Sequence, residues 1–171
     1  MSQNLHEIDL DTFQCDVFHM FGKATPLLTT GDRASFNTMT IGWGGLGTLW
    51  GKPVCTVYVR PERYTYEFME QYDSFTVSVF GADYKKAMAL CGTKSGRDVD
   101  KVAECALTPM FAHGDAPYFA EADLVIVCKK LYKQDLTSVC TVAEETVLPY
   151  YGEKGNWHRM YVGEVVQVLK K

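Results

Sequence analysis

The sequence lacks the usual signals for export and for membrane insertion. No run approaches the roughly 20 apolar residues that a helix needs to span a bilayer. The first residues, MSQNLHEIDLDTFQ, contain neither the basic start nor the apolar stretch of a signal peptide. We therefore expect the protein to stay where it is made, in the cytoplasm.

Several common catalytic motifs are also missing. No GxGxxG follows an expected strand, which argues against a Rossmann dinucleotide site. The segment GTKSG lacks the Gly-Lys-Ser/Thr order of a phosphate loop, and the chain has no GxSxG of the kind that marks many hydrolases. The 4 histidines share no ligand spacing and have no accompanying cysteine pair, so we predict that the chain holds no metal.

An overall excess of positive charge is absent as well. The net charge is −4 at pH 7 and the pI is about 5.5. General nucleic-acid binders usually carry a concentrated basic face, so we expect no nucleic-acid partner. The basic residues of interest are local, because Lys94, Arg97 and Lys101 gather in one expected loop.

The 6 cysteines show no spacing that suggests a disulfide framework or a CxxC redox motif. Since no export signal accompanies them, we interpret them as reduced thiols. Cys55 and Cys128 lie inside strand-like runs, where a free cysteine behaves as a small apolar residue. The role of Cys91 stays open, because it leads directly into the loop CGTKSG.

The bulk composition is that of an ordinary globular protein. The chain has 171 residues, of which 47% are apolar and 22% charged. A domain of about this size buries roughly 70% of the surface that its unfolded chain exposes. No linker, repeat or low-complexity tract divides the sequence, so we expect one domain over residues 1–171.

Short strands and shorter helices alternate along the chain. The apolar and alternating runs predict strands over residues 54–59, 75–80, 123–132 and 159–169. Helices are expected over residues 62–71 and 84–90 and in a short segment that ends near Glu104, with Asp83 and Asp98 as N-caps of the last two. We interpret residues 15–21 as an edge strand or loop and residues 108–117 as loop. Strands separated by such short helices favour a closed barrel.

The most informative stretch is residues 37–70, which read NTMTIGWGGLGTLWGKPVCTVYVRPERYTYEFME. Its glycines allow close backbone approach and positive φ, and its tryptophans offer broad apolar faces to a planar heterocycle: Gly42, Gly44, Gly45, Gly47, Trp43 and Trp50. Arg60-Pro61 then ends the expected strand, and Pro61 fits the first position of a helix. The free N–H groups of such a helix would suit a phosphate.

Several separate blocks make the chain resemble a known family. They are NTMTIGW, TVYVRPERYTYEFME, SFTVSVF, CGTKSGRDVDK and HRMYVGEVVQV, in this order. Through them the sequence is similar to the flavin reductase-like proteins of the FMN-binding split barrel, in particular the flavoredoxin-like branch. The resemblance implies a mainly β, Greek-key split barrel with a few short helices. It also implies a homodimer that holds FMN at or near the subunit interface.

The resemblance assigns the isoalloxazine ring of FMN to the first block. Backbone groups around Met39, Thr40 and Ile41 would bind the edge of the ring, together with their neighbours Asn37, Gly42 and Trp43. Backbone partners suit a flavin, because the protein places and tunes a ring whose chemistry is its own. The alternative is a tight barrel turn with packed tryptophans.

Two further sets of residues are candidates for the phosphate and the ribityl chain. Arg60, Tyr64 and Thr65 form one set, in which the guanidinium offers a planar fork to phosphate oxygens. Its alternative is a helix start in which Arg60 pairs with Glu62 or Glu67, and such an exposed pair contributes only about 0 to 1 kcal/mol. The other set comes from one loop, for which a solvated surface loop is the alternative: Ser95, Gly96, Arg97 and Lys101.

His158 is the candidate catalytic residue. Many flavin reductases carry Gly-Asp-His beside the flavin and the nicotinamide, whereas this chain has Gly155-Asn156-Trp157-His158. The histidine matches, but the aspartate does not and one residue intervenes. A histidine that simply bonds a backbone carbonyl is the alternative.

The resemblance implies an oxidoreductase in which FMN accepts a hydride from NADH or NADPH and passes electrons to a second flavin or a redox protein. No side chain need act as an acid or base, because alignment of the rings carries the reaction. One alternative is a flavoredoxin-like electron carrier without NAD(P)H activity of its own. Another is a barrel that binds a flat ligand for storage or sensing without turnover.

Overall fold

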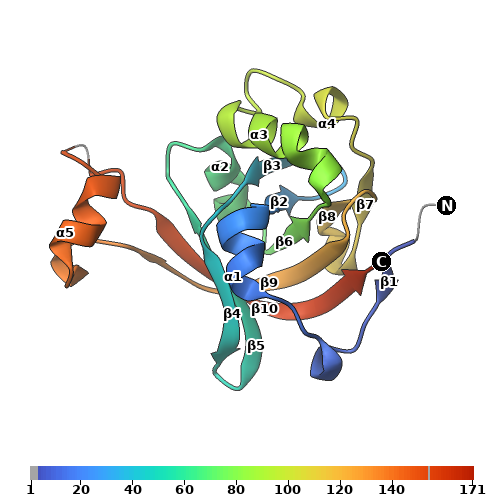
Figure 1. Cartoon of the computed structure of the whole chain (residues 1–171), viewed down its shortest axis with the longest axis horizontal. Coiled ribbons are helices and arrows are strands. Elements are labelled where there is room, and N and C mark those ends of the chain that lie inside the picture. The colour runs from blue at the N-terminus through green and yellow to red at the C-terminus, as the bar shows by residue number, and fades with distance from the viewer. Residues whose placement is uncertain (1–3, 154) are drawn as a thin grey trace.

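The fold is built around antiparallel strands, with several short helices at one end and another on a projecting arm (Figure 1). The computed structural model describes residues 4–153 and 155–171. Its strands are β1 (His6–Glu7), β2 (Leu27–Gly31), β3 (Phe36–Thr40), β4 (Gly44–Leu49), β5 (Lys52–Val59), β6 (Ser74–Val79), β7 (Pro109–Phe111), β8 (Pro117–Phe119), β9 (Leu124–Asp135) and β10 (Arg159–Lys170). The expectation of a mainly β protein with few short helices is confirmed.

The main sheet of the described residues follows the order β3-β2-β6-β9-β10-β5-β4, with β1 added beside β10. All its neighbours run antiparallel. The long strands β9 and β10 shift register between Val162 and Gly163 and again between Val165 and Gln167. A Cβ at Gly163 would lie 2.7 Å from the Phe75 ring and 2.8 Å from Cβ of Cys128. Glycine therefore lets the strands cross closely where the sheet bends.

Both faces of the central strands are buried. Along β9, Ile126 and Cys128 belong to one apolar cluster, whereas Val125 and Val127 belong to the other. This alternation explains the continuous apolar run that predicted the strand. The first cluster fills the space enclosed by the sheet, and the second extends beneath the helices.

The helices that matter for the site cover the β3 edge of the sheet (Figure 1). They are α2 (Tyr64–Gln71), α3 (Lys85–Thr93) and α4 (Lys101–Glu104). The remaining helical elements are η1 (Leu10–Thr12), α1 (Val17–His19), η2 (Met20–Ala24), η3 (Ala82–Tyr84), η4 (His113–Asp115), η5 (Ser138–Cys140), α5 (Glu144–Val147) and η6 (Leu148–Tyr150). In the described part of the chain, no helix is long and apolar enough to cross a membrane.

Between β9 and β10 the chain leaves the barrel and forms a projecting arm, residues 136–153 and 155–158 (Figure 1). The arm carries α5 and the adjoining turns. Its return brings Tyr150, Tyr151 and His158 back toward the strand ends.

All four predicted strands are present, and several helical boundaries differ from prediction. Helix α2 begins at Tyr64, because Pro61 lies in a turn closed by the Arg63 N–H and the Arg60 carbonyl. The N-caps were also predicted wrongly. Asp100 caps α4 by accepting from the Val102 and Ala103 amides at 3.1 and 3.0 Å, whereas no side chain caps α3.

Two segments differ from their interpretation as an edge strand or loop (residues 15–21) and as loop (residues 108–117). Residues 15–21 include α1 and the start of the π-helical turn η2, since Asp16 caps the first by accepting from the His19 amide. Residues 108–117 contain β7, which pairs with β8. All six cysteines are free thiols, as predicted, and Cys55, Cys91 and Cys128 are buried.

Candidate functional site

A continuous groove follows the free edge of β3, where the strand faces the loops around α2, α3 and α4. It comprises a polar cavity of about 210 Å³, an aromatic cavity of about 250 Å³ and an outer cavity of about 370 Å³. Asn37 and Lys101 line both the outer and the polar cavity, and Arg63 lines both the polar and the aromatic cavity. The groove thus offers a polar end and an aromatic end to one elongated ligand.

The structure brings the sequence-predicted residues together in two adjoining groups. The polar cavity is lined by Asn37, Tyr64, Thr65, Ser95, Gly96, Arg97 and Lys101. The aromatic cavity is lined by Met39, Thr40, Ile41, Gly42, Trp43, Arg60 and His158. Segments from four parts of the chain therefore meet here, and the assignment of a cofactor to them remains a prediction.

Asn37 fixes one wall of the polar cavity. Its Nδ2 donates to Oγ1 of buried Thr65 at 2.8 Å, which joins β3 to the first turn of α2. A Cβ at Gly96 would lie 2.1 Å from Oδ1 of Asn37, so only glycine allows the loop backbone to approach this amide. The wall therefore depends on the hydrogen bond between Asn37 and Thr65 and on glycine at position 96.

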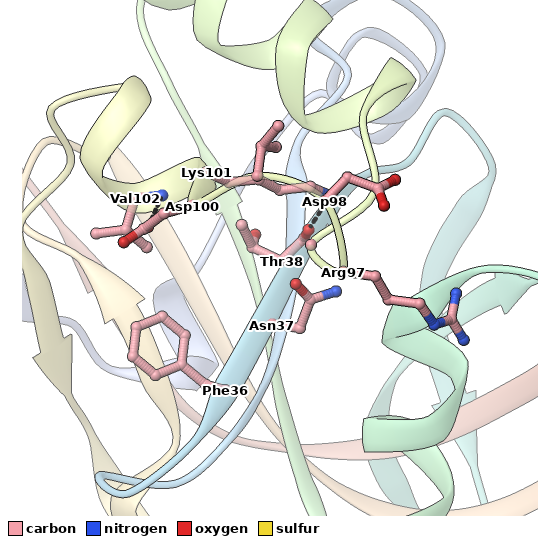
Figure 2. Close-up of a pocket in the computed structure, with 10 residues that line it drawn as sticks. Phe36, Asn37, Thr38, Arg97, Asp98, Asp100, Lys101 and Val102 are labelled. Atoms are coloured by element: carbon pink, nitrogen blue, oxygen red, sulfur yellow. Dashed lines mark hydrogen bonds between the residues drawn. The ribbon is translucent and has the colours of Figure 1, made fainter.

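Lys101 places a buried positive charge in this wall. Its residue is 5% exposed, and its ammonium donates to the carbonyls of Thr38 at 2.7 Å and Cys91 at 3.0 Å (Figure 2). Among the described residues it forms no salt bridge, and burial lowers its pKa. An ammonium has three donors, so one remains for a ligand. An anion in the polar cavity would meet a charge that the protein leaves without a carboxylate.

Arg63 is a second cation at the polar cavity, and the sequence interpretation missed it. It is the N-cap residue of α2, and its Nη2 donates to the Gly92 carbonyl at 3.0 Å. Burial lowers its pKa, and the nearby Glu62 carboxylate offsets part of that effect. The sequence signal that could have indicated Arg63 is the second arginine of RPER. Because Pro61 lies in the turn before α2, the helix begins later than predicted, and Arg63 is the arginine at its start.

Arg60 does not line the polar cavity with Tyr64 and Thr65, the residues with which the phosphate hypothesis groups it. Its Nη2 donates to the Tyr150 carbonyl at 2.7 Å, and its guanidinium lies 5.4 Å from the centroid of the Tyr151 ring. It lines the aromatic cavity and not the polar one. Neither Glu62 nor Glu67 pairs with it in the described structure. Arg60 therefore anchors the arm of residues 136–153 and 155–158.

The loop at residues 95–99 is an ordered turn. The Ser95 hydroxyl accepts from the Arg97 amide at 3.2 Å, and the Ser95 carbonyl accepts from the Asp98 amide at 3.1 Å. In Figure 2 the Arg97 side chain extends away from Lys101. It pairs with Glu67, and its guanidinium lies 4.6 Å from the centroid of the Tyr64 ring. These contacts hold the loop in one conformation beside the polar cavity, and the pair of Arg97 with Glu67 lies at the exposed surface, as in a solvated loop.

Backbone groups of β3 face the groove along its unpaired edge. Thr38 uses its carbonyl there for Lys101, and peptide groups alternate along a strand, so those of Thr40 share this edge. The Ile41 amide lies on the opposite side of the chain, where it donates to the Pro26 carbonyl at 2.9 Å. The hydroxyl of Thr40 donates to the Met88 carbonyl at 2.5 Å. Thr40 is thus the position in this block with backbone groups facing the aromatic end.

The expected glycine and tryptophan loop is mostly strand. Residues 44–49 form β4, and neither its three glycines nor Gly42 before it has a positive φ. A Cβ at Gly44 would lie 2.3 Å from the Phe21 ring, so its role is packing. Trp50 lies in the turn after β4 and contacts Tyr132 at a ring distance of 5.8 Å. Of the two tryptophans, only Trp43 lines the groove.

Trp43 and His158 form the aromatic end. Their ring centroids are 4.6 Å apart, and Tyr150 meets the indole edge-on at 5.2 Å. Nδ1 of His158 bonds the Tyr151 hydroxyl at 3.0 Å, and not a backbone carbonyl as in the alternative interpretation. Burial, helped by the Arg60 charge, lowers the pKa of His158 to about 4. The imidazole is therefore neutral at pH 7 and does not act as a cationic acid.

No group of three histidine, cysteine, aspartate or glutamate side chains is placed to hold a metal in residues 4–153 and 155–171. The groove is instead lined by arginine and lysine side chains, hydroxyls, an amide and backbone groups, together with the carboxylates of Glu62, Asp98 and Asp100. Such a set fits an anion at one end and a flat polar ring at the other.

Comparisons with known proteins bear on this arrangement. The family model described as the flavin reductase like domain matches residues 18–171. No sequence among curated proteins matches the chain. The flavoredoxin of Desulfovibrio vulgaris (Miyazaki F) is 26% identical, with a TM-score of 0.65 over 84% of this chain and 67% of that chain.

Two more solved structures share the fold. An FMN-binding domain of a flavin reductases-like enzyme from Shewanella baltica OS155 is 18% identical, with a TM-score of 0.71 over 99% of this chain and 78% of that chain. An NADH:FAD oxidoreductase from Streptomyces globisporus C-1027 is 17% identical, with a TM-score of 0.64 over 86% of this chain and 76% of that chain. The predicted split-barrel fold is confirmed.

Proposed function

The chain belongs to the flavin reductase-like family, and from this we propose that it is an FMN-binding oxidoreductase. FMN occupies the groove along β3, with its phosphate in the polar cavity and its ring in the aromatic cavity. When bound, the flavin supplies the capacity to accept a hydride from NADH or NADPH and to pass electrons to a second flavin or a redox protein.

The observation that carries this proposal is the pair of cations at the polar cavity. Lys101 and Arg63 are both at least partly withdrawn from solvent, and both donate only to backbone carbonyls in the described structure. Unpaired buried charge is costly, and a bound phosphate would remove that cost. The resulting hydrogen bonds would be charge-assisted and strong.

The protein's part in the reaction is to bind, orient and exclude water. Lys101, Arg63 and the loop at Ser95 hold the anionic end. The Thr40 edge and the faces of Trp43 and His158 position a ring. Because His158 is neutral, it offers a polar edge without a charge that would perturb the ring. Rate then rests on alignment, so we assign no side chain as acid or base.

A second copy of the chain is the partner we propose. An apolar cavity of about 840 Å³ adjoins the aromatic one and shares Gly42, Trp43 and Tyr58 with it. Phe18 lines this cavity and is 92% exposed. Exposed apolar surface of this kind marks interaction sites. Sedimentation velocity should give a dimer, and Phe18→Ser should weaken it, whereas a monomer at micromolar concentration would contradict the proposal.

Visible absorption spectroscopy tests the central claim. Protein supplied with FMN and desalted should retain flavin bands, and anaerobic NADH or NADPH should bleach them. Lys101→Met is the matched variant that should lose the flavin, with Lys86→Met on the exposed face of α3 as its control. A protein that retains no flavin after reconstitution would contradict the proposal.

The alternative is an electron carrier, which the 26% identity to a flavoredoxin favours. Retained flavin bands that ignore both nucleotides but bleach with a reduced redox partner would support it. Flavin that stays reduced in the presence of every acceptor would support storage or sensing. We also propose the cytoplasm as the place of action, which fractionation of cells tests.

A further inference from the structure

Two thiols meet at the interface between α3 and α4. The Sγ atoms of Cys91 and Cys105 are 4.0 Å apart, and Sγ of Cys105 lies 3.8 Å from the Ala87 carbonyl. Cys91 is fully buried, whereas Cys105 is partly exposed. No other residue needs to move aside for the two sulfur atoms to approach each other, because they already touch.

These thiols stand at the two ends of the loop that forms the polar cavity. The loop between them carries Ser95, Gly96 and Lys101. The Lys101 ammonium bonds the carbonyl of Cys91, and the Cys105 amide donates to the carbonyl of Lys101 at 3.0 Å. Any change at the sulfur pair therefore reaches the buried cation through direct hydrogen bonds.

We propose that Cys91 and Cys105 form a reversible disulfide on exposure to peroxide, and that this disulfide weakens anion binding in the polar cavity. The second part rests on the proposed function, whereas the first does not. A disulfide requires the sulfur atoms to close from 4.0 Å to about 2.05 Å. This draws α4 toward α3 and shifts Lys101, whose bonds to two carbonyls depend on its present position.

The chemistry needs only hydrogen peroxide as the oxidant. The sulfur of Cys105 attacks one peroxide oxygen, so an S–O bond forms, the O–O bond breaks, and the leaving hydroxide takes the thiol proton as water. The sulfur of Cys91 then attacks the sulfenic sulfur, and an S–S bond replaces the S–O bond. The second hydroxide takes the Cys91 proton. Two thiols and one peroxide give one disulfide and two waters.

The environment sets the order of these steps. Burial, with the neighbouring Cys105 adding to it, raises the pKa of the Cys91 thiol to about 12. Cys91 therefore carries little thiolate at pH 7, and the partly exposed Cys105 meets the oxidant first. Cys91 then attacks the oxidised Cys105 because the two sulfur atoms already lie close together, and not because its thiol is acidic.

Peptide mass mapping after peroxide treatment and alkylation tests the disulfide. We expect a linked peptide that contains Cys91 and Cys105, lighter by two hydrogens and reversed by dithiothreitol. Cys105→Ser should abolish it, and Cys140→Ser, which removes an exposed thiol in the arm, should leave it intact. If Cys91 and Cys105 stay alkylatable while Cys140 oxidises, or if only sulfinic acid forms, the disulfide is ruled out.

FMN titration of the reduced and oxidised protein tests the coupling. The oxidised form should bind FMN at least fivefold more weakly, and Cys105→Ser should bind equally before and after peroxide. By linkage, saturating FMN should shift the thiol–disulfide equilibrium in a dithiothreitol buffer toward the two thiols by the same factor. If the disulfide is mapped but the reduced and oxidised proteins bind FMN equally, the coupling is overturned and the disulfide stands. If neither form binds FMN, the proposed function and the coupling are both contradicted. The mass mapping decides the disulfide in either case.

Discussion

The ammonium of Lys101 on α4 donates a 2.7 Å hydrogen bond to the Thr38 carbonyl on β3. This bond ties a buried charge to the unpaired edge of the strand. The charge and the edge are thus positioned before any ligand arrives, which reduces the entropy that binding must overcome. The predictions below depend on this arrangement and on the residues beside it.

Lys101→Met should weaken FMN binding about 10- to 150-fold, because a hydrogen bond to a charged group contributes about 1.5 to 3 kcal/mol. It should also lower the free energy of unfolding by about 1 to 3 kcal/mol, since the Thr38 and Cys91 carbonyls lose their donor. Flavin fluorescence and urea unfolding measure the two effects. Lys86→Met should show neither, and an unchanged affinity in Lys101→Met would remove this cation from the site.

Arg63→Gln should cost more FMN affinity than Arg60→Gln. Arg63 lines the polar cavity, whereas Arg60 is occupied by the Tyr150 carbonyl at the other end. We expect a loss of about 10- to 100-fold for Arg63 and less than about fivefold for Arg60. FMN titrations of the two variants measure both losses. A larger loss of affinity in Arg60→Gln than in Arg63→Gln would instead support Arg60 as the phosphate ligand.

Gly96→Ala should weaken FMN binding without unfolding the protein. The new methyl group would lie 2.1 Å from Oδ1 of Asn37, so the Asn37 amide must move from Thr65. We expect at least a tenfold loss, since a buried hydrogen bond of the wall is broken. Gly47→Ala is the control, because nothing lies within 4 Å of its new Cβ. Equal affinities in the two variants would contradict this account of the wall.

His158 predicts a dependence of stability on pH. Its folded pKa of about 4 lies below the ordinary 6.5, so the unfolded chain takes up a proton that the folded protein refuses. The contribution is fully present above pH 6.5 and is lost as pH falls toward 4. We expect roughly 1 to 2 kcal/mol after solvent screening of the half-buried ring.

The difference between wild type and His158→Gln in urea unfolding at pH 7 and pH 5 measures this effect. His19→Gln, at an exposed position, is the control. NMR titration of the folded protein checks the cause directly, and a His158 midpoint near 6.5 would refute it.

The strands were predictable because their side chains carry the signal. The run from Leu124 to Cys128 is apolar at every position, and the structure buries both faces of β9 there. The pairing of β7 with β8 was not predictable, because three-residue strands are too short for any period to appear. Their pairing is imposed by the rest of the fold.

Most residues that line the groove could be predicted from the sequence, but the contacts among them could not. Spacing in the sequence could not tell which arginine of RPER faces the polar cavity, because that depends on whether Pro61 lies inside the helix. Likewise, the bond from Lys101 to Thr38 joins positions far apart in the chain. Such contacts follow from packing of α4 on β3, which no local pattern encodes.

The arm of residues 136–153 and 155–158 supplies Tyr150, Tyr151 and His158 to the aromatic end alone. The polar end is made by the barrel and its covering helices. The segments at residues 37–43 and 60–65 serve both ends, so the arm is the stretch of sequence that contributes to the aromatic end and not to the polar one. Insertions or deletions in the arm would therefore change the aromatic end during evolution, while the polar cavity keeps its walls.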